Sequence, residues 1–113
     1  MKLIELAYFT DNVRAMADFY RSLLSAEPIA SSEDMAIFMS GETKIFIHKK
    51  YPASESELPP ENHIAFAVQD VDAICASLTQ SGLTLEIAPK DYYWGRSSYL
   101  RDPDGQLVEI TGK

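Results

Sequence analysis

The sequence predicts an α+β fold built from two copies of one strand–helix–strand–strand–strand module. The first observation is an internal repeat, because the stretch that begins at Glu5 aligns without a gap with the stretch that begins at His63, 58 positions later (63 − 5). The second is that each copy has an apolar segment followed by apolar residues at helical spacing. The third is the length of 113 residues, which suits one small domain. We therefore expect one domain, 1–113, of two repeats.

The first module is expected at about 1–48, and each of its elements has a signal in the sequence. Residues 3–10 are dense in apolar and aromatic side chains, which favours a strand. Asp11 or Asn12 can cap the helix that follows. The helical spacing of apolar residues ends near Ser25. Further strands of this module are expected at 28–32, 35–39 and 44–48.

The second module, at about 63–113, repeats this order after a linker. The linker at 49–62 holds three prolines and shows little periodicity. Asp70 can cap a second helix, for which Gly82 is a natural C-terminal stop. The strands of this module are expected at 63–68, 83–87, 96–101 and 106–111, the last two joined by the turn Arg101–Gly105.

The composition excludes several classes of partner. A net charge of -7 and a pI near 4.7 argue against nucleic acid or an anionic membrane surface. The chain has one cysteine, Cys75, so an internal disulfide is ruled out and a reducing compartment is favoured. The N-terminal segment carries Glu5 where a signal peptide needs an apolar run, and no apolar stretch reaches the length of a membrane span. We expect a cytoplasmic protein.

Four polar residues lie on the less aliphatic faces of otherwise apolar strands. Strand alternation puts Glu5 and His63 on faces that they share with small alanines, which suits the wall of a cleft. His48 and Glu109 occupy similar faces near the ends of their strands. The opposite, aliphatic faces are expected to cover the helices. Because a carboxylate flanked by Ile4 and Leu6 is costly to bury unpaired, Glu5 needs a cation or solvent.

The motifs of the second module resemble those of the glyoxalase/bleomycin-resistance/dioxygenase superfamily, also called vicinal oxygen chelate proteins. They are the opening His63–Asp70, the triplet Trp94-Gly95-Arg96, and the run Arg101–Glu109. The first module adds Asn12 and the pair Phe19-Tyr20. The resemblance covers nearly the whole chain. It implies that the two modules pair into a curved, partly open mixed sheet around a cleft.

The resemblance also implies a metal site. In metal-binding members the ligands come from the first and last strands of each module, and the corresponding positions here are Glu5, His63 and Glu109, with His48 or Phe46 on the fourth strand. Two imidazoles and two carboxylates suit a divalent ion such as Ni, Zn, Co, Mn or Fe. The alternatives are plain surface or structural roles, so a site without metal stays open.

The activity that the resemblance implies is that of a metal-dependent lyase or isomerase of glyoxalase type. The metal would hold two oxygens of a small substrate and stabilise an enediolate, while Glu109 or Glu5 moves the proton. A fosfomycin-type thiol transferase is a neighbouring reaction, although it would prefer histidine in the first strand. A ring-cleaving dioxygenase fits less well, since this chain has only His48 and His63.

The alternative is a metal-free binding protein of bleomycin-resistance type that sequesters a cationic small molecule in an acidic, aromatic cleft. Whichever function applies, the resemblance puts Trp94, Arg96 and Tyr99 near a strand that lines the pocket in relatives, so they are candidate substrate-binding residues, and Arg96 could hold a substrate carboxylate. Aromatic residues at such spacing also suit a core, a pocket rim or a dimer contact. Under either function we expect a homodimer.

Overall fold

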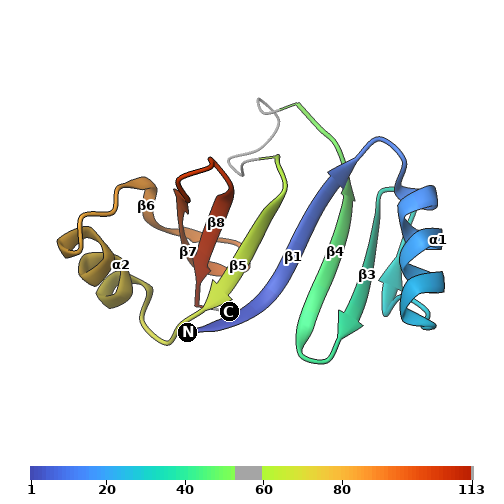
Figure 1. The fold of residues 1–113 in the computed structure, drawn as a ribbon, viewed down its shortest axis with the longest axis horizontal. Coiled ribbons are helices and arrows are strands. Elements are labelled where there is room, and N and C mark those ends of the chain that lie inside the picture. Colours follow the sequence, from blue (N-terminus) through green and yellow to red (C-terminus); the bar gives the residue numbers. More distant parts are fainter. Residues whose placement is uncertain (53–59, 113) are drawn as a thin grey trace. The chain divides into compact units, whose positions relative to one another are not determined.

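The computed structural model describes residues 1–52 and 60–112 and divides the chain into two compact units (Figure 1). The first unit is Glu5–Asn62, and the second is Met1–Ile4 together with His63–Lys113. Part of the linker expected at 49–62, residues 53–59, lies outside the described residues. None of the helices in the described ranges is long and apolar enough to cross a membrane.

The first unit contains one helix packed against a small sheet. Its elements are β1 (Lys2–Thr10, which begins in the second unit), α1 (Val13–Leu24), β2 (Ala30–Ser31), β3 (Met35–Ser40) and β4 (Thr43–Lys49). The strand order is β2-β3-β4-β1, with β1 parallel and β3 antiparallel to β4. Figure 1 shows α1 beside β3, and the core between α1 and the strands β3 and β4 contains Phe38, Ile45 and Ile47. The expected aliphatic face of β4 is therefore the one that covers the helix.

The second unit repeats this arrangement. It contains β5 (His63–Ala67), α2 (Val71–Gln80), β6 (Leu85–Tyr92), β7 (Gly95–Arg101) and β8 (Leu107–Thr111), in the strand order β5-β8-β7-β6. Strand β5 is parallel to β8, as β1 is to β4. Its core contains Cys75, Leu100 and Ile110 and lies between α2 and the sheet. The predicted α+β class and both strand–helix–strand–strand–strand modules are confirmed.

Local signals set the ends of both helices. The Asn12 side chain accepts a hydrogen bond from the Ala15 N–H at 3.1 Å, and the Asp70 side chain accepts one from the Ala73 N–H at 3.0 Å. Helix α1 ends at Ser25, whose φ of 50° is left-handed. After α2, Gly82 takes a φ of 99°, which favours glycine.

Two strands differ from the sequence-based expectation. Strand β2 is shorter than 28–32, and β6 extends well beyond 83–87, to Tyr92. Strand β6 continues past Pro89 because its register with β7 shifts between Ile87 and Lys90, which places the proline in an irregular segment. A proline lacks the N–H that a regular ladder needs, so this irregularity lets the hairpin continue.

Candidate functional site

The polar side chains of the second unit gather on the sheet face opposite α2. Strand pairing sets Ala65 of β5 and Tyr99 of β7 on either side of Glu109 of β8. Strand alternation then puts His63 and Ser97, each two residues away from one of these neighbours, on the same face as Glu109. The opposite face supplies Leu100 and Ile110 to the core. The sheet thus separates a packing face from a polar face.

His63 and Glu109 lie together on this polar face. The distance from His63 Nε2 to Glu109 Oε1 is 3.5 Å, and both side chains are almost fully buried. Two donor atoms that each bind one ion at roughly 2.0–2.2 Å lie about 3.4 Å apart at a tetrahedral angle. The pair therefore fits the spacing of two ligands on one divalent ion, and imidazole with carboxylate is a common ligand combination for such ions.

Ser97 holds the other oxygen of the same carboxylate. Its hydroxyl donates to Glu109 Oε2 at 2.7 Å, and its Oγ accepts a hydrogen bond from Trp94 Nε1 at 3.2 Å. Ser97 is 0% exposed and Glu109 2% exposed. Sequence reasoning missed Ser97, because its strand parity with Tyr99 was the only signal and the register between β7 and β8 is needed to place both on the face of Glu109.

Glu5 belongs to the first unit and is also buried, at 6% exposure. Its partner across the β1–β4 ladder is Lys44, whose Nζ lies 3.9 Å from Glu5 Oε1. This ion pair is long, and the lysine side chain is partly exposed. Lys44 therefore offsets part of the cost of burying the Glu5 carboxylate.

His48 lies in an aromatic group of the first unit. Its ring contacts those of Phe9, Phe46 and Tyr51, with centroid distances of 5.6–5.8 Å. Its Nδ1 lies 2.6 Å from the Lys49 carbonyl oxygen, a hydrogen bond in which the ring nitrogen donates. His48 is therefore held within its own unit by three aromatic contacts of its ring and by a hydrogen bond of one ring nitrogen.

The register of the two units identifies the counterpart of Glu109. The internal repeat equates Ala7 with Ala65, and Glu109 pairs with Ala65. Ala7 pairs with Phe46. Phe46 is therefore the first-unit counterpart of Glu109, whereas His48, two residues further along β4, is the counterpart of Thr111. His48 also lies four residues beyond Lys44, the partner of Glu5, or about 13 Å along the strand.

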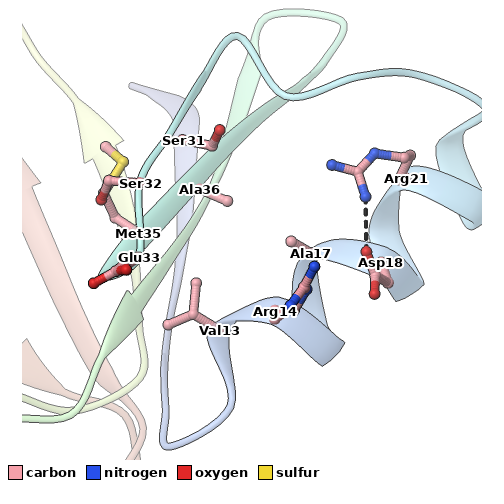
Figure 2. Close-up of a pocket in the computed structure, with 10 residues that line it drawn as sticks. All are labelled: Val13, Arg14, Ala17, Asp18, Arg21, Ser31, Ser32, Glu33, Met35 and Ala36. Carbon is pink, nitrogen blue, oxygen red and sulfur yellow. Dashed lines mark hydrogen bonds and ion pairs between the residues drawn. The ribbon is translucent and has the colours of Figure 1, made fainter.

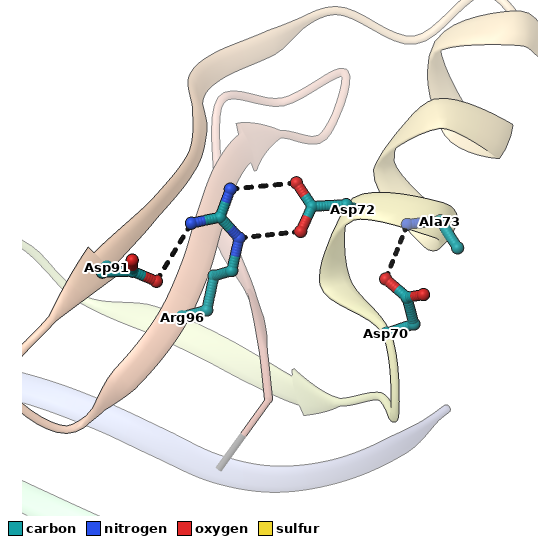
Figure 3. A network of polar contacts seen from close by, with 5 residues as sticks. All are labelled: Asp70, Asp72, Ala73, Asp91 and Arg96. Atoms are coloured by element: carbon teal, nitrogen blue, oxygen red, sulfur yellow. Dashed lines mark hydrogen bonds and ion pairs between the residues drawn. The ribbon is translucent and has the colours of Figure 1, made fainter.

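Arg96 is engaged by two carboxylates (Figure 3). It makes a two-bond contact with Asp72, through Nε at 2.7 Å and Nη2 at 3.0 Å, and a third bond to Asp91 at 3.0 Å. The hydrogen bonds from Arg96 lower the pKa of Asp72 below its ordinary value, and those from both carboxylates raise the pKa of Arg96. This clamp joins the first turn of α2 to the β6–β7 hairpin. The predicted grip on a substrate carboxylate would have to compete with it.

The other two predicted substrate residues belong to an aromatic group around the β6–β7 turn. The ring of Trp94 stacks on Tyr92 with centroids 4.5 Å apart and planes 8° apart. Tyr99 is buried and packs edge-on against both His63 and Tyr92. Tyr93, at the turn, is 93% exposed. The group therefore runs from a solvent-facing ring to the ring beside His63.

A separate pocket lies in the first unit (Figure 2). It has a volume of about 450 Å³ and lies between α1 and the β2–β3 segment. Val13, Ala17 and Ala36 form part of its lining, and Arg21 at its rim pairs with Asp18 at 2.7 Å. None of the site residues predicted from the sequence lines it. This pocket is therefore not formed by the predicted site residues.

Comparison with known proteins agrees with this architecture. The family model described as Glyoxalase/Bleomycin resistance protein/Dioxygenase superfamily matches residues 2–110. The uncharacterized protein YraH of Bacillus subtilis (strain 168) is 29% identical over 97% of each chain. The metallothiol transferase FosB of Shouchella clausii (strain KSM-K16) is 26% identical over 93% of this chain and 75% of its own. Both likenesses cover nearly the whole of this chain.

A solved structure shows the same fold. A hypothetical protein from Bacillus halodurans C-125 superposes with a TM-score of 0.77 at 18% identity, covering 99% of this chain and 94% of its own. At this level of identity the likeness concerns the arrangement of the elements and not the chemistry.

Proposed function

The chain belongs to the Glyoxalase/Bleomycin resistance protein/Dioxygenase superfamily, and from this membership we propose that it is a metal-dependent lyase or isomerase of glyoxalase type. The observation that carries the proposal is the pair of His63 and Glu109, nearly buried and 3.5 Å apart. A carboxylate in such surroundings is stabilised by a cation, and this one already has its second oxygen held by Ser97.

The ligands that we propose are those that the sequence predicts, Glu5, His63 and Glu109. The internal repeat supports Glu5, since it occupies the position that His63 has in the second module. The fourth ligand predicted at His48 stays a prediction, and the register favours a set of three with Phe46 at the fourth position. Such a set suits Ni, Zn, Co, Mn or Fe.

The residues divide the proposed chemistry between them. When bound, a divalent ion would act as a Lewis acid toward two oxygens of a small substrate. Glu109 or Glu5 would move the proton of the substrate. The Tyr99 ring, which packs edge-on against His63, would keep water from that side of the imidazole. The relative named as a metallothiol transferase makes thiol transfer the neighbouring reaction to assay.

Elemental analysis tests the metal requirement. Protein purified without chelator or affinity-tag metal is expected to hold close to one metal per chain. The Glu109→Ala/His63→Ala double variant is expected to lose it. Glu86→Ala is the matched control, since Glu86 is also a strand glutamate in an ion pair, with Arg101, but is partly exposed and lies on β6. It is expected to keep the metal.

Two results would contradict the proposal. One is wild-type protein that holds no metal even after incubation with Ni, Zn, Co, Mn and Fe. The other is a double variant that holds as much as the wild type, because the ion would then sit elsewhere. A positive result would direct assays to proton-transfer chemistry beside two chelated oxygens.

A second candidate function is the metal-free binding of a cationic small molecule. The observation that favours it is the exposed Tyr93 beside the stacked rings of Tyr92 and Trp94, in a chain with a net charge of -7. Aromatic faces attract cations, and an acidic surface raises their local concentration. Equilibrium dialysis of chelator-treated protein against matched cationic and anionic aromatic dyes tests this function. Equal retention of both dyes would contradict it.

The homodimer and the cytoplasmic location expected from the sequence remain part of the proposal. Light scattering during size-exclusion chromatography measures the assembly directly, since 12.6 kDa per chain predicts about twice that mass for a dimer. A mass near that of one chain at micromolar concentration would contradict the dimer.

A further inference from the structure

Ser97 is a fully buried serine whose hydroxyl makes two hydrogen bonds of opposite sense. It accepts from the Trp94 indole and donates to Glu109 Oε2. A serine hydroxyl carries one proton, and an indole N–H can only donate. The direction of hydrogen-bond donation is therefore fixed, from Trp94 to Ser97 and from Ser97 to Glu109.

We propose that Ser97 is a positioning residue for the Glu109 carboxylate, and that Trp94, Ser97 and Glu109 form a relay that couples ion binding at Glu109 to the aromatic turn Tyr92–Trp94. The inference rests on the proposed function, since it takes Glu109 as a metal ligand. It adds a residue that neither the sequence motifs nor the family membership assigns.

The geometry allows Ser97 to orient the Glu109 carboxylate. By holding Oε2 at 2.7 Å, it fixes the rotation of the carboxyl plane, which leaves Oε1 directed at His63. A hydrogen bond to an ionised oxygen is stronger than one between neutral groups. Residues that orient a metal ligand in this way commonly change metal affinity by roughly 10–100-fold when removed.

The other end of the relay reaches the surface of the second unit. Trp94 stacks on Tyr92 and packs edge-on against Tyr93, which is almost fully exposed. A ligand that contacts these rings would therefore change the position of the indole that donates to Ser97. Coupling of this kind is reciprocal, so ion binding at Glu109 would in turn change the environment of Trp94.

The neighbouring residue, Ser98, provides a matched control. It is as buried as Ser97, and its hydroxyl is also hydrogen-bonded, to the Ile87 carbonyl oxygen at 2.6 Å. Strand alternation directs it to the opposite face of the sheet. Ser98→Ala therefore removes a buried hydroxyl of the same kind without touching Glu109.

The experiment is a titration of metal-free protein with Zn²⁺, followed in parallel by calorimetry and by tryptophan fluorescence. Trp94 is the only tryptophan in the sequence, so the emission reports on the relay. The wild type and Ser98→Ala are expected to bind one ion per chain with a saturable fluorescence change. Ser97→Ala is expected to bind roughly 10–100-fold more weakly and to lose the fluorescence change at saturation.

A second variant separates the two links of the relay. Trp94→Phe keeps an aromatic ring on Tyr92 but removes the indole donor. The Ser97–Glu109 bond then remains, so the calorimetric affinity should fall less than in Ser97→Ala. An affinity loss as large as that of Ser97→Ala would overturn the positioning role of the hydroxyl.

The remaining outcomes are distinct from a failure of the proposed function. If the wild type binds Zn²⁺ and Ser97→Ala binds it equally well with the same fluorescence change, the relay is wrong and the metal site stands. If Ser97→Ala and Ser98→Ala weaken binding equally, the effect is one of general stability and the relay is wrong. If the wild type binds neither Zn²⁺ nor, in the same titration, Ni, Co, Mn or Fe ions, both proposals are overturned.

Discussion

The strands of the two units pair in the same register but carry different side chains. In the second unit, Glu109 pairs with Tyr99, while Ser97 pairs with Thr111. At the corresponding positions of the first unit, Phe46 pairs with Ile37, while Met35 pairs with His48. The second unit thus has a hydrogen-bonded carboxylate and serine where the first unit has a phenylalanine and a methionine. The polar network belongs to one copy, whereas the strand pairing that positions its residues is common to both.

The opposite faces of the same strands have changed much less. Ile45 and Ile47 pack under α1, and Val108 and Ile110 pack under α2. Every residue on these faces must fill space against a helix, so close packing limits the changes that are tolerated. The packing face therefore sets the fold of each module, whereas the other face can carry different side chains without changing that fold. Metal chemistry would then depend chiefly on the second unit.

The largest expected effect in these comparisons comes from the packing faces. Ile47→Ala and Ile110→Ala each remove a buried side chain from one core, and each is expected to lower the free energy of unfolding by about 2–5 kcal/mol. Because the sequence predicts one domain, both variants should lower the midpoint of a single thermal transition. Calorimetry that resolves two transitions, each moved by one variant only, would show instead that the units unfold separately.

A smaller effect is expected when the polar network is copied into the first unit. Phe46→Glu places a carboxylate diagonally across from Glu5, as Glu109 lies relative to His63. It also removes ring contacts with His48, and Met35 offers no hydroxyl to hold the new group. We expect a loss of about 2 kcal/mol in the free energy of unfolding in metal-free protein, measured with urea.

Phe46→Gln is the control for this change, since it has the same shape as the glutamate without its charge. Added Zn²⁺ should raise the stability of Phe46→Glu and leave that of Phe46→Gln unchanged relative to the wild type. A glutamate variant as stable as the wild type without metal would show that the first unit tolerates a carboxylate there, and would remove the contrast between the units.

Much of this arrangement could be read from the sequence because its signals are local. Helix caps at Asn12 and Asp70 and the alternation of apolar residues depend on neighbours in the chain. The same alternation placed His63 and Glu109 on corresponding faces, and the structure brings these two side chains together.

The remaining features depend on the pairing of strands that are distant in sequence. Alternation has a period of two, so it could not distinguish Phe46 from His48, which share a face. Only the pairing of Ala7 with Phe46 decides which of them corresponds to Glu109. Ser97 was missed for the same reason, since its partner is set by the register between β7 and β8.

The two helix caps allow a comparison with an expected effect of about 1 kcal/mol. Asn12 and Asp70 each accept one hydrogen bond from the backbone N–H three residues later. Asn12→Ala and Asp70→Ala should therefore lower the free energy of unfolding by similar amounts, with Asp70 losing slightly more because its charge also favours the helix N-terminus. Urea unfolding measures both. An effect in only one variant would show that the modules do not rely equally on their helices.

The smallest expected effect concerns the first turns of the helices, where the repeat sets Arg14 against Asp72. Hydrogen bonds from Arg96 lower the pKa of Asp72 below its ordinary value of 3.8. A lowered pKa means that the contribution of this carboxylate to stability is present above the ordinary value and is lost as the pH falls through the folded-state value. The thermal midpoint of Asp72→Asn should therefore fall less steeply in acid than that of the wild type, from pH 5 downward.

The control is Asp104→Asn. It changes the same kind of group at an exposed position where the described residues show no ion pair, so its midpoint should follow the wild-type curve. Parallel curves for the wild type and Asp72→Asn would mean that the clamp of Arg96 persists on a protonated Asp72, or that it contributes nothing to folding.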